Sequence, residues 1–321
     1  MSRGQVFYLQ MGCLGLAVLL APLFMSNPYY LNVLNVVALN VIAVTGLNLL
    51  IGFAGAVSLG HAAFIGLGAY LSGMLSSIWG WPPLAAALAA AVLAALVALV
   101  IGLPTLRLEG NYLVMATLGF NLIVGIIMLQ ADQYTGGPSG LSGIEPVRLL
   151  GMTFSDDQSF YWLAWAVALL GLALARNLAA SRVGRGLRAL HDSPLAAAAV
   201  GVPTANYKVR VFVLSAVYAS ISGSLYAHYF GIITPRTFDI FRSVELVTMC
   251  LVGGMGSLWG GFIGAAFLTP LPQALHVFDQ YKDVFYGGLL MVLLIREPEG
   301  LVGAWRRLRP RFGPKATGRP A

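Results

Sequence analysis

Few residues in this chain could do chemistry, and they are scattered. The four histidines stand far apart: His61, His191, His228 and His276. None of them has metal-site spacing or an acidic neighbour on the same helical face. The two cysteines, Cys13 and Cys250, each lie within an apolar stretch, where packing is their usual role. The sequence contains no phosphate-binding loop, zinc-hydrolase motif or nucleophile elbow. We therefore predict no catalytic residue, metal or cofactor, and any energy source must lie in another protein.

The apolar content of the chain requires a membrane. Of its 321 residues, 58% are hydrophobic and 10% are charged, and the mean hydropathy is +0.81. A helix needs about 20 apolar residues to cross the hydrocarbon core. Stretches of this kind cover residues 6–25, 31–51, 62–78, 84–103, 112–129, 160–175 and 211–229, and residues 246–295 divide into three more. The sequence predicts an all-α polytopic membrane protein, one domain over residues 1–321 with about ten transmembrane helices.

Basic residues are unevenly distributed between the expected loops. Residues 176–210 carry six Lys or Arg against one Asp, and residues 296–321 carry seven against two acids. Residues 130–159 carry four acids against one Arg. Because cytoplasmic loops are enriched in Lys and Arg, we expect a cytoplasmic loop over residues 177–210, a basic cytoplasmic tail over 297–321 and a periplasmic loop over 130–159. Both termini are then cytoplasmic, and the net charge of +7 is explained by insertion and membrane lipid without nucleic acid.

Two glycine-rich interruptions, at residues 52–61 and 253–261, break the apolar pattern. Glycines allow helices to pack closely, and they also occur where broken helices line a transport path. Charged residues are nearly absent from the expected spans, with Glu245 at the mouth of one, which argues against an ion-coupled carrier. The polar residues that remain are neutral, and asparagine in such helices more often joins helices than binds substrate. The candidate path residues are Asn48, Gly55, Ser58, Gly60, His61, Thr117, Asn121, Gly254 and Gly256.

A short capped helix is predicted inside the basic loop. Ser193 and Pro194 form an N-cap followed by proline at the first helical position, and Gly201 is a stop signal. A second short helix over residues 183–191 would place Arg185 and Arg188 on one side. A two-turn helix melts alone, so it must dock on another surface, unless the segment is only a solvated positive loop.

Five stretches of the sequence resemble one known family when taken together. They are GLNLLIGFAGAVSLGHAAFIGLGAY, TLRLEGNYLVMATLGF, YTGGPSGLSGIEP, GRGLRALHDSPLAAAAVGVPTANYKVRVFVLSAVYASISGSLYA and LVGGMGSLWGGFIGAA. They resemble the M-type permease subunits of bacterial ABC importers for branched-chain amino acids, and the resemblance covers about residues 34–302. It implies the ABC importer permease fold and a place in the bacterial inner membrane. The implied partners are a homologous second permease, two cytoplasmic ATP-binding subunits and a periplasmic substrate-binding protein.

The resemblance also implies roles for two loops. In the family, the segment corresponding to residues 184–201 docks on the ATPase. The coupling residues implied here are Gly184, Arg185, Gly186, Arg188, Ala189, Asp192, Pro194, Ala197, Gly201 and Lys208. The outer loop could contact the binding protein or form the substrate mouth, or it could be a plain turn. The candidates there are Thr135, Gly136, Gly137, Pro138 and Ser139, and Arg236 and Arg242, with Asp239, are candidates expected on the next outer loop.

Two departures from the family pattern affect the details. His191–Pro194 stands where many members carry an acidic run, and Leu122 stands where they carry a glutamate. The relatives are associated with urea, short amides and other amino acids as well. Branched-chain or related hydrophobic amino acids are therefore the leading substrate, those compounds are alternatives, and an ion-coupled secondary carrier is a further alternative.

Overall fold

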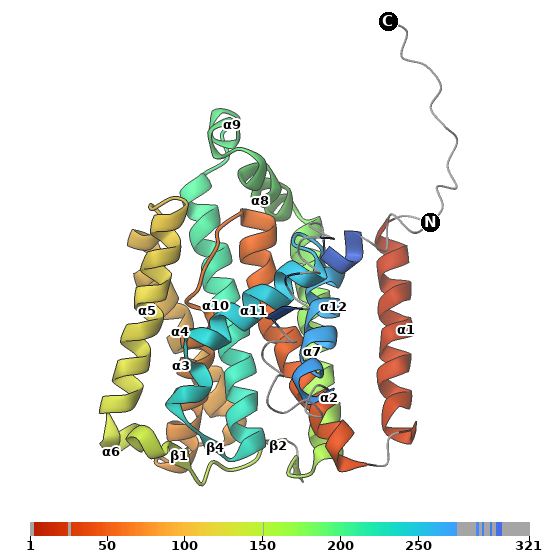
Figure 1. Cartoon of the computed structure of the whole chain (residues 1–321), viewed down its shortest axis with the longest axis vertical. Coiled ribbons are helices and arrows are strands. Elements are labelled where there is room, and N and C mark those ends of the chain that lie inside the picture. The colour runs from red at the N-terminus through yellow and green to blue at the C-terminus, as the bar shows by residue number, and fades with distance from the viewer. Residues whose placement is uncertain are drawn as a thin grey trace, which may run out of the picture.

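The molecule is almost entirely helical (Figure 1). The structure, a computed structural model, describes residues 3–24, 27–149, 151–274, 287–288, 291, 296 and 300–303. Its helices are α1 (Arg3–Phe24), α2 (Pro28–Asn48), α3 (His61–Ser77), α4 (Pro83–Thr105), α5 (Asn111–Gln130), α6 (Asp132–Thr135), α7 (Asp157–Ala180), α8 (Arg182–Asp192), α9 (Pro194–Ala199), α10 (Thr204–Phe230), α11 (Ile240–Gly253), α12 (Leu258–Leu268) and α13 (Leu271–Ala274). The other elements are a π-helix η1 (Leu49–Phe53), two 3-10 turns η2 (Gly137–Ser139) and η3 (Pro235–Phe238), and the two-residue strands β1 (Leu141–Ser142), β2 (Arg148–Leu149), β3 (Met152–Thr153) and β4 (Ile232–Ile233).

Five helices of the described chain are long and apolar enough to cross a membrane: α2 with η1, α4, α5, α7 and α10. The α11–α12 pair is a sixth candidate, bent by 119° at its break. The expected stretches up to residue 229 all lie on helices, but the count of ten is not confirmed. Residues 246–268, expected to contribute to separate spans, belong to this one bent pair, and most of residues 275–295 lie outside the described part.

Helix α2 occupies the centre of the bundle. Within an 18-residue apolar stretch of Pro28–Phe53, 89% of the residues are buried inside the molecule, against 28% in the corresponding stretch of α4 and 33% in that of α5. Helices α7, α10 and α12 all pack on α2, and α10 also packs on α3 and α4. The outer faces of α4 and α5 expose aliphatic side chains such as Val92 and Ile123, as lipid-facing helices do. Polar groups carried by α2 are therefore held by protein on every side.

Local sequence signals explain where the helices begin. The Asn27 side chain accepts a hydrogen bond from the Tyr29 amide, and Pro28 occupies the first helical position of α2. At α7 the Asp156 carboxylate accepts hydrogen bonds from the amide and hydroxyl of Ser159, which lowers the pKa of Asp156 from its ordinary value. Each cap defines the residue at which its helix begins, and both helices begin at the same end of the molecule.

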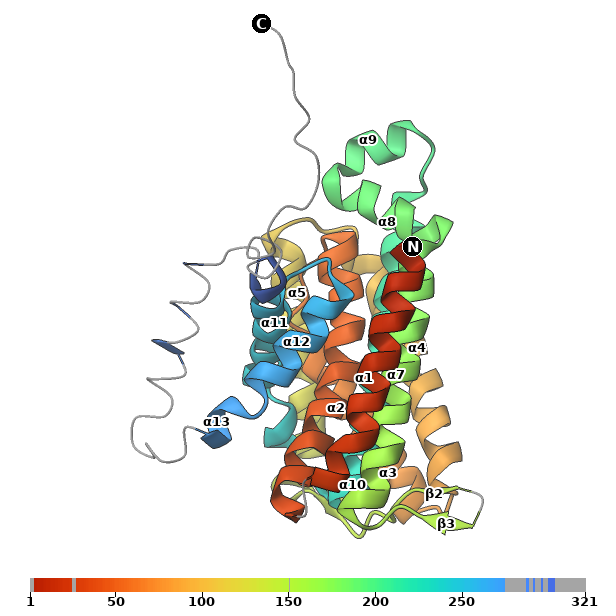
Figure 2. The same ribbon diagram turned by 90° about the vertical axis from the view of Figure 1, so that its right-hand side faces the viewer.

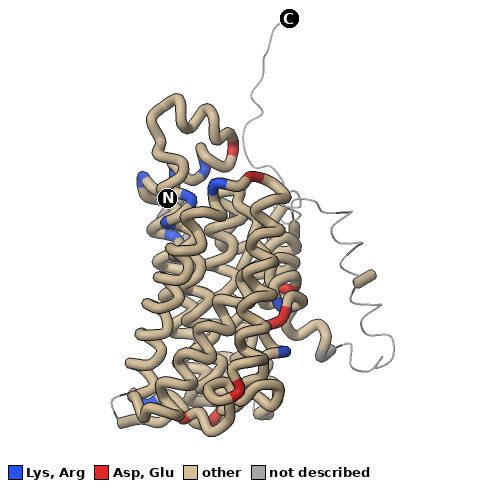
Figure 3. The backbone as a smooth tube through the Cα atoms, turned by 90° about the vertical axis from the view of Figure 1, so that its left-hand side faces the viewer, with Lys and Arg blue, Asp and Glu red and all other residues tan. Residues whose placement is uncertain are grey.

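The two ends of the bundle differ in build and in charge. Helices α8 and α9 stand out from one end, as Figures 1 and 2 show, while the short strands lie at the other. Strand β1 pairs antiparallel with β4, and β2 with β3. Most Lys and Arg residues gather at the end with α8 and α9 (Figure 3), which we call the basic end. The opposite end, with Asp132, Glu145, Asp156 and Asp157, is the acidic end.

Candidate functional site

The basic end carries the two short helices that the sequence predicts. Ser193 separates α8 from α9, and its hydroxyl accepts a hydrogen bond from the Ala196 amide at 3.2 Å. Pro194 is the first residue of α9. The helix ends at Ala199, and two residues later Gly201 has a φ of +81° while the amide of Val202 donates to the Ala197 carbonyl. Both predicted caps are confirmed, so this segment is folded rather than an extended charged loop.

Helix α8 is seated on the π-helix that ends α2. The Arg188 guanidinium lies 5.5 Å from the centre of the Phe53 ring and donates to the Ala179 carbonyl at 2.5 Å. A side-chain carbon added at Gly55 would lie 2.8 Å from His191 Nδ1, so the backbone after η1 runs directly beneath α8. Movement of α8 would therefore act on the end of the central helix.

The remaining predicted coupling residues form two sets, one packed against other elements and one exposed on the surface. Gly184 packs against the end of α7, Gly186 against the Tyr207 ring, and Ala197 is only 2% exposed.

By contrast, Leu195 is 85% exposed and Val200 78% exposed on α9, although neither was predicted as a site residue. The surface candidates are Arg185, Asp192 and Pro194, Ala189 is half-buried, and Lys208 lies 4.0 Å from Glu109. Exposed apolar side chains next to a polar surface mark an interaction site, and the composition of the segment does not show which side chains are exposed.

The two glycine-rich interruptions meet in space. A side-chain carbon at Gly52 would overlap the Gly256 amide, so the two backbones are in contact. Asn48 joins them, since its amide donates to the Ser257 carbonyl at 2.7 Å and its Oδ1 accepts from the Gly256 amide at 3.1 Å. Gly254, at φ +114°, lies at the same break and packs against Gly300. Among the predicted path residues, Asn48, Gly254 and Gly256 thus form one group.

Most of the other predicted path residues form a second buried group, after the first interruption. The Thr117 hydroxyl accepts from the Leu59 amide at 3.1 Å, and Ser58 Oγ accepts from the Gly60 amide. His61 is fully buried with Nε2 3.1 Å from Ser215 Oγ, while His61 Nδ1 has no partner in the described structure. The Asn121 side-chain oxygen is likewise buried without a partner there. Leu122 is half exposed on the outer side of α5 and does not belong to this group.

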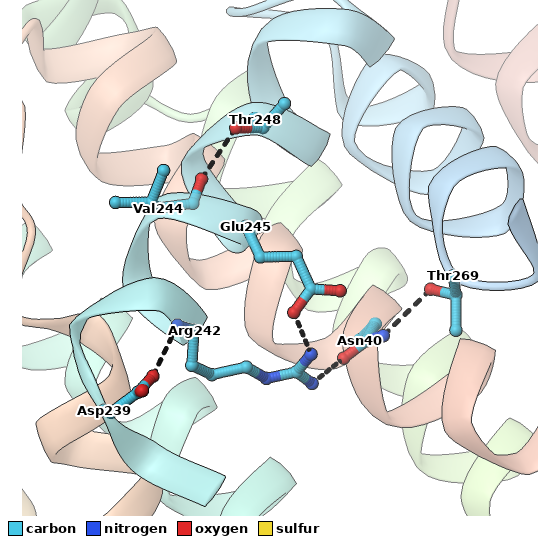
Figure 4. Close-up of polar contacts among 7 residues, drawn as sticks. All are labelled: Asn40, Asp239, Arg242, Val244, Glu245, Thr248 and Thr269. Carbon is cyan, nitrogen blue, oxygen red and sulfur yellow. Dashed lines mark hydrogen bonds and ion pairs between the residues drawn. The ribbon is translucent and has the colours of Figure 1, made fainter. Parts of the chain in front are cut away.

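A third polar group lies where sequence reasoning expected an outer loop. Arg242 is in α11, and its guanidinium bonds Glu245 Oε2 at 2.6 Å and the side-chain oxygen of Asn40 (Figure 4). Asn40 in turn donates to Thr269 Oγ1 at 2.8 Å. Because Asn40 stands at the middle of the 26-residue span Pro28–Phe53, the ion pair lies at mid-depth. The expectation that Arg242 lies on an outer loop and Glu245 at the mouth of a span is therefore wrong.

This group also reveals the path of the α11–α12 pair. The start of α11 and the end of α12 both reach Asn40, while the break between them reaches Asn48 and Gly52. Such contacts describe a re-entrant hairpin that rises from mid-depth toward the basic end and returns. Helices of 14 and 11 residues are each too short to span the bilayer. The sequence offered a broken helix at residues 253–261 as one alternative but did not predict the return of α12, because each half is apolar enough to pass as part of a span.

The predicted outer loop at the acidic end is mainly a packed turn. Thr135 is buried, and its hydroxyl accepts from the Gly137 amide at 3.2 Å. Gly136 and Gly137 have φ values of +72° and +55° and leave no room for a side chain. Pro138 and Ser139 are exposed, and so is Arg236 on η3. The turn interpretation thus accounts for Thr135, Gly136 and Gly137, while Pro138, Ser139 and Arg236 remain candidates for contact.

The fold and these groups define a class of protein. A bundle of apolar helices, with a broken re-entrant pair and buried polar groups on a central helix, is a polytopic membrane protein of the transporter type. Residues 29–294 match the family model described as the branched-chain amino acid transport system / permease component. The chain belongs to this family.

Similar proteins agree with that assignment. The High-affinity branched-chain amino acid transport system permease protein LivM of Escherichia coli is 30% identical over 281 residues, which cover 79% of this chain and 65% of LivM. LivH of the same organism is 30% identical over 149 residues, 46% of this chain and 47% of LivH. The Autoinducer 2 import system permease protein LsrC of Klebsiella pneumoniae is 26% identical over 213 residues, 64% of this chain and 59% of LsrC. The chain thus covers less than two thirds of the length of LivM. No solved structure matches.

Proposed function

We propose that this chain is the M-type permease subunit of an ATP-driven importer for branched-chain or related hydrophobic amino acids. The observation that carries the proposal is the α8–α9 pair, which is seated on the central helix and exposes Leu195 and Val200 beyond the bundle. A helix pair with outward apolar side chains needs a partner surface. The family description and the similarity to LivM support the same assignment.

The sidedness follows from charge. The basic end, with the coupling loop over residues 177–210, lies in the cytoplasm, and the acidic end, with the loop over residues 130–159, faces the periplasm. Both termini and the basic tail over residues 297–321 are cytoplasmic in this arrangement. The location is the inner membrane of a bacterium.

The working complex contains four kinds of subunit. This chain pairs with a homologous second permease, and two ATP-binding subunits dock on the α8–α9 pairs from the cytoplasm. A substrate-binding protein delivers its cargo to the acidic end, where Pro138, Ser139 and Arg236 are exposed. Closure of the ATP-binding subunits moves α8, which acts through Phe53 and Gly55 on η1 and, through the Gly52–Gly256 contact, on the re-entrant pair.

Reconstitution tests this proposal. The complex in liposomes, given ATP inside and the binding protein with L-leucine outside, should accumulate leucine, and an uncoupler should leave the rate unchanged. Leu195→Asp or Arg188→Glu should abolish uptake, because both residues lie on the docking pair, whereas Met152→Asp, at an equally exposed apolar position on the acidic end, should transport normally. ATP-independent uptake that collapses with the ion gradient would instead identify a secondary carrier.

The substrate is a separate question within the same function. LsrC is named for the import of a different compound, so the family is not limited to one cargo. Urea, short amides and other amino acids are the alternatives. Competition of each compound against leucine in the same liposomes ranks them, and uptake of amides with no uptake of leucine would replace the amino acid assignment.

A further inference from the structure

The Arg242–Glu245 pair lies at a depth where lipid cannot accept it. The side chains of Arg242 and Glu245 are 21% and 30% exposed, and Arg242 bonds Asn40 at the middle of the Pro28–Phe53 span. Charged groups at the centre of a bilayer face a water-filled cavity or another protein. The face of α11 that carries this pair is therefore not a lipid-facing surface.

The pair retains unused hydrogen-bonding capacity. A guanidinium has five N–H donors, and in the described structure the side chain of Arg242 uses them only toward Glu245 and Asn40. Glu245 Oε1 accepts no hydrogen bond from any residue that the structure describes. A donor group and an acceptor group are thus available side by side, each carrying a full charge.

Apolar residues and one further carboxylate accompany the pair. Phe241 is 77% exposed and Val244 45% exposed, and each stands one position before a charged residue of the pair. The exposed Asp239 carboxylate accepts a hydrogen bond from the Arg242 amide at 3.1 Å. The Thr248 hydroxyl is used locally, since it donates to the Val244 carbonyl at 2.8 Å (Figure 4). The surface offers the Arg242–Glu245 ion pair, the nearby Asp239 carboxylate and adjacent apolar side chains.

We propose that Arg242, Glu245 and Asn40 form a binding station for a zwitterionic amino acid with an apolar side chain. Arg242 binds the carboxylate, Glu245 binds the ammonium group, and the substrate side chain lies against Phe241 and Val244. Arg242 and Glu245 exchange their ion pair with one another for ion pairs with the substrate, so no charge is left uncompensated at mid-depth. The station rests on the proposed function, and it assigns substrate class to this chain rather than to a binding protein alone.

Thiol accessibility tests whether the face is open to water. In a Cys13→Ala, Cys250→Ala background, Val244→Cys is placed beside the pair and Ile123→Cys, 59% exposed on α5, serves as the matched control. Only the thiolate reacts, so a charged methanethiosulfonate reagent should modify Val244→Cys at least about tenfold faster than Ile123→Cys. Millimolar L-leucine should slow that reaction, while urea and isovalerate, which lack one or both charges, should not. Equal reaction rates at the two positions, or equal protection by urea, would overturn the station.

Transport tests the charges themselves. Glu245→Gln keeps the shape of the side chain, and its kcat/KM for leucine uptake should fall about 10- to 100-fold, as expected for loss of a charge-assisted contact. The control is Glu145→Gln, in the exposed Glu145–Arg148 pair at the acidic end, which should transport normally. Wild-type uptake by Glu245→Gln would overturn the station while leaving the proposed function intact. A wild-type complex that shows no ATP-dependent uptake would overturn the proposed function, and leucine protection of Val244→Cys would still be measurable.

Discussion

The break after η1, at residues 54–60, and the break between α11 and α12, at residues 254–257, are held in different ways. The first break continues a buried helix and runs under α8, so it contacts a helix that stands outside the bundle. The second joins two short helices at 119° and is held from inside, by Asn48 and by close backbone contacts. Under the proposed function, we therefore expect the first break to transmit a displacement of α8 and the second break to move in response.

The largest expected effect is on the second break. A side chain at Gly253 would overlap the carbonyl of Gly260, so Gly253→Val must separate α11 from α12. The loss of stability should exceed the ~1–3 kcal/mol usual for overpacking. The melting temperature of the purified complex, followed by size-exclusion chromatography after heating, measures it. Gly125→Val in α5, where a side chain meets nothing within 4 Å, is the control and should melt like the wild type.

A smaller effect is expected where the two breaks touch. Gly52→Ala places a methyl group against the Gly256 amide, so it should push the breaks apart while α2 and α11 remain folded. Substrate-stimulated ATPase activity of the full complex should fall more than tenfold (about 1.4 kcal/mol) with the melting temperature lowered by only a few degrees. Gly119→Ala, on an open face of α5, is the matched change. Normal stimulation in Gly52→Ala would separate the two breaks functionally.

Much of this arrangement was accessible from sequence, and the reasons are physical. Apolar length gave the helices up to residue 229, and local caps gave α8 and α9, because both signals lie within one helix. The asparagines were expected to join helices, and Asn35, Asn40 and Asn48 each bond another element. The helices and caps depend on neighbours along the chain, whereas the partner of each asparagine does not and was not predicted.

The parts that were not accessible depend on distant contacts. The depth of Arg242 follows from the return of α12 to Asn40, which no local pattern encodes. Ala197 was predicted to couple to a partner, but packing against other elements decides which side of α9 is buried, and Ala197 is on the buried side. The contact of Gly52 with Gly256 likewise joins residues far apart in sequence.

Removal of the link between the breaks should have a moderate effect. Asn48→Ala deletes two hydrogen bonds, to Ser257 and from Gly256, and bonds of this kind between membrane helices contribute about 0.6–1.7 kcal/mol each. We expect a melting temperature lowered by a few degrees and a partial loss of stimulated ATPase activity. Asn32→Ala, which removes one bond to the Tyr229 hydroxyl, provides the comparison and should leave stimulation unchanged. The reverse order of effects would show that Asn48 does not link the breaks.

The smallest effect distinguishes contact from backbone strain at the first break. Gly55→Ala and Gly201→Ala both place alanine at positive φ, +69° and +81°, which costs about 1–2 kcal/mol. Only Gly55 lies beneath His191, and the imidazole can rotate away. The two variants should therefore be equally stable, while stimulated ATPase activity should drop about twofold further in Gly55→Ala. Identical activities would mean that α8 does not act through Gly55.

The β1–β4 pairing has a consequence for the opposite end of the molecule. These two-residue strands tie the loop that carries Pro138 and Ser139 to the residues immediately after α10. Helix α10 packs on α2, α3 and α4, so it touches most of the bundle. In the proposed importer, a substrate-binding protein docked on this loop would therefore contact a segment that is tied to one end of α10, and the other end of α10 is Thr204, close to α9 in the chain. We expect docking at the acidic end to affect the basic end through this helix.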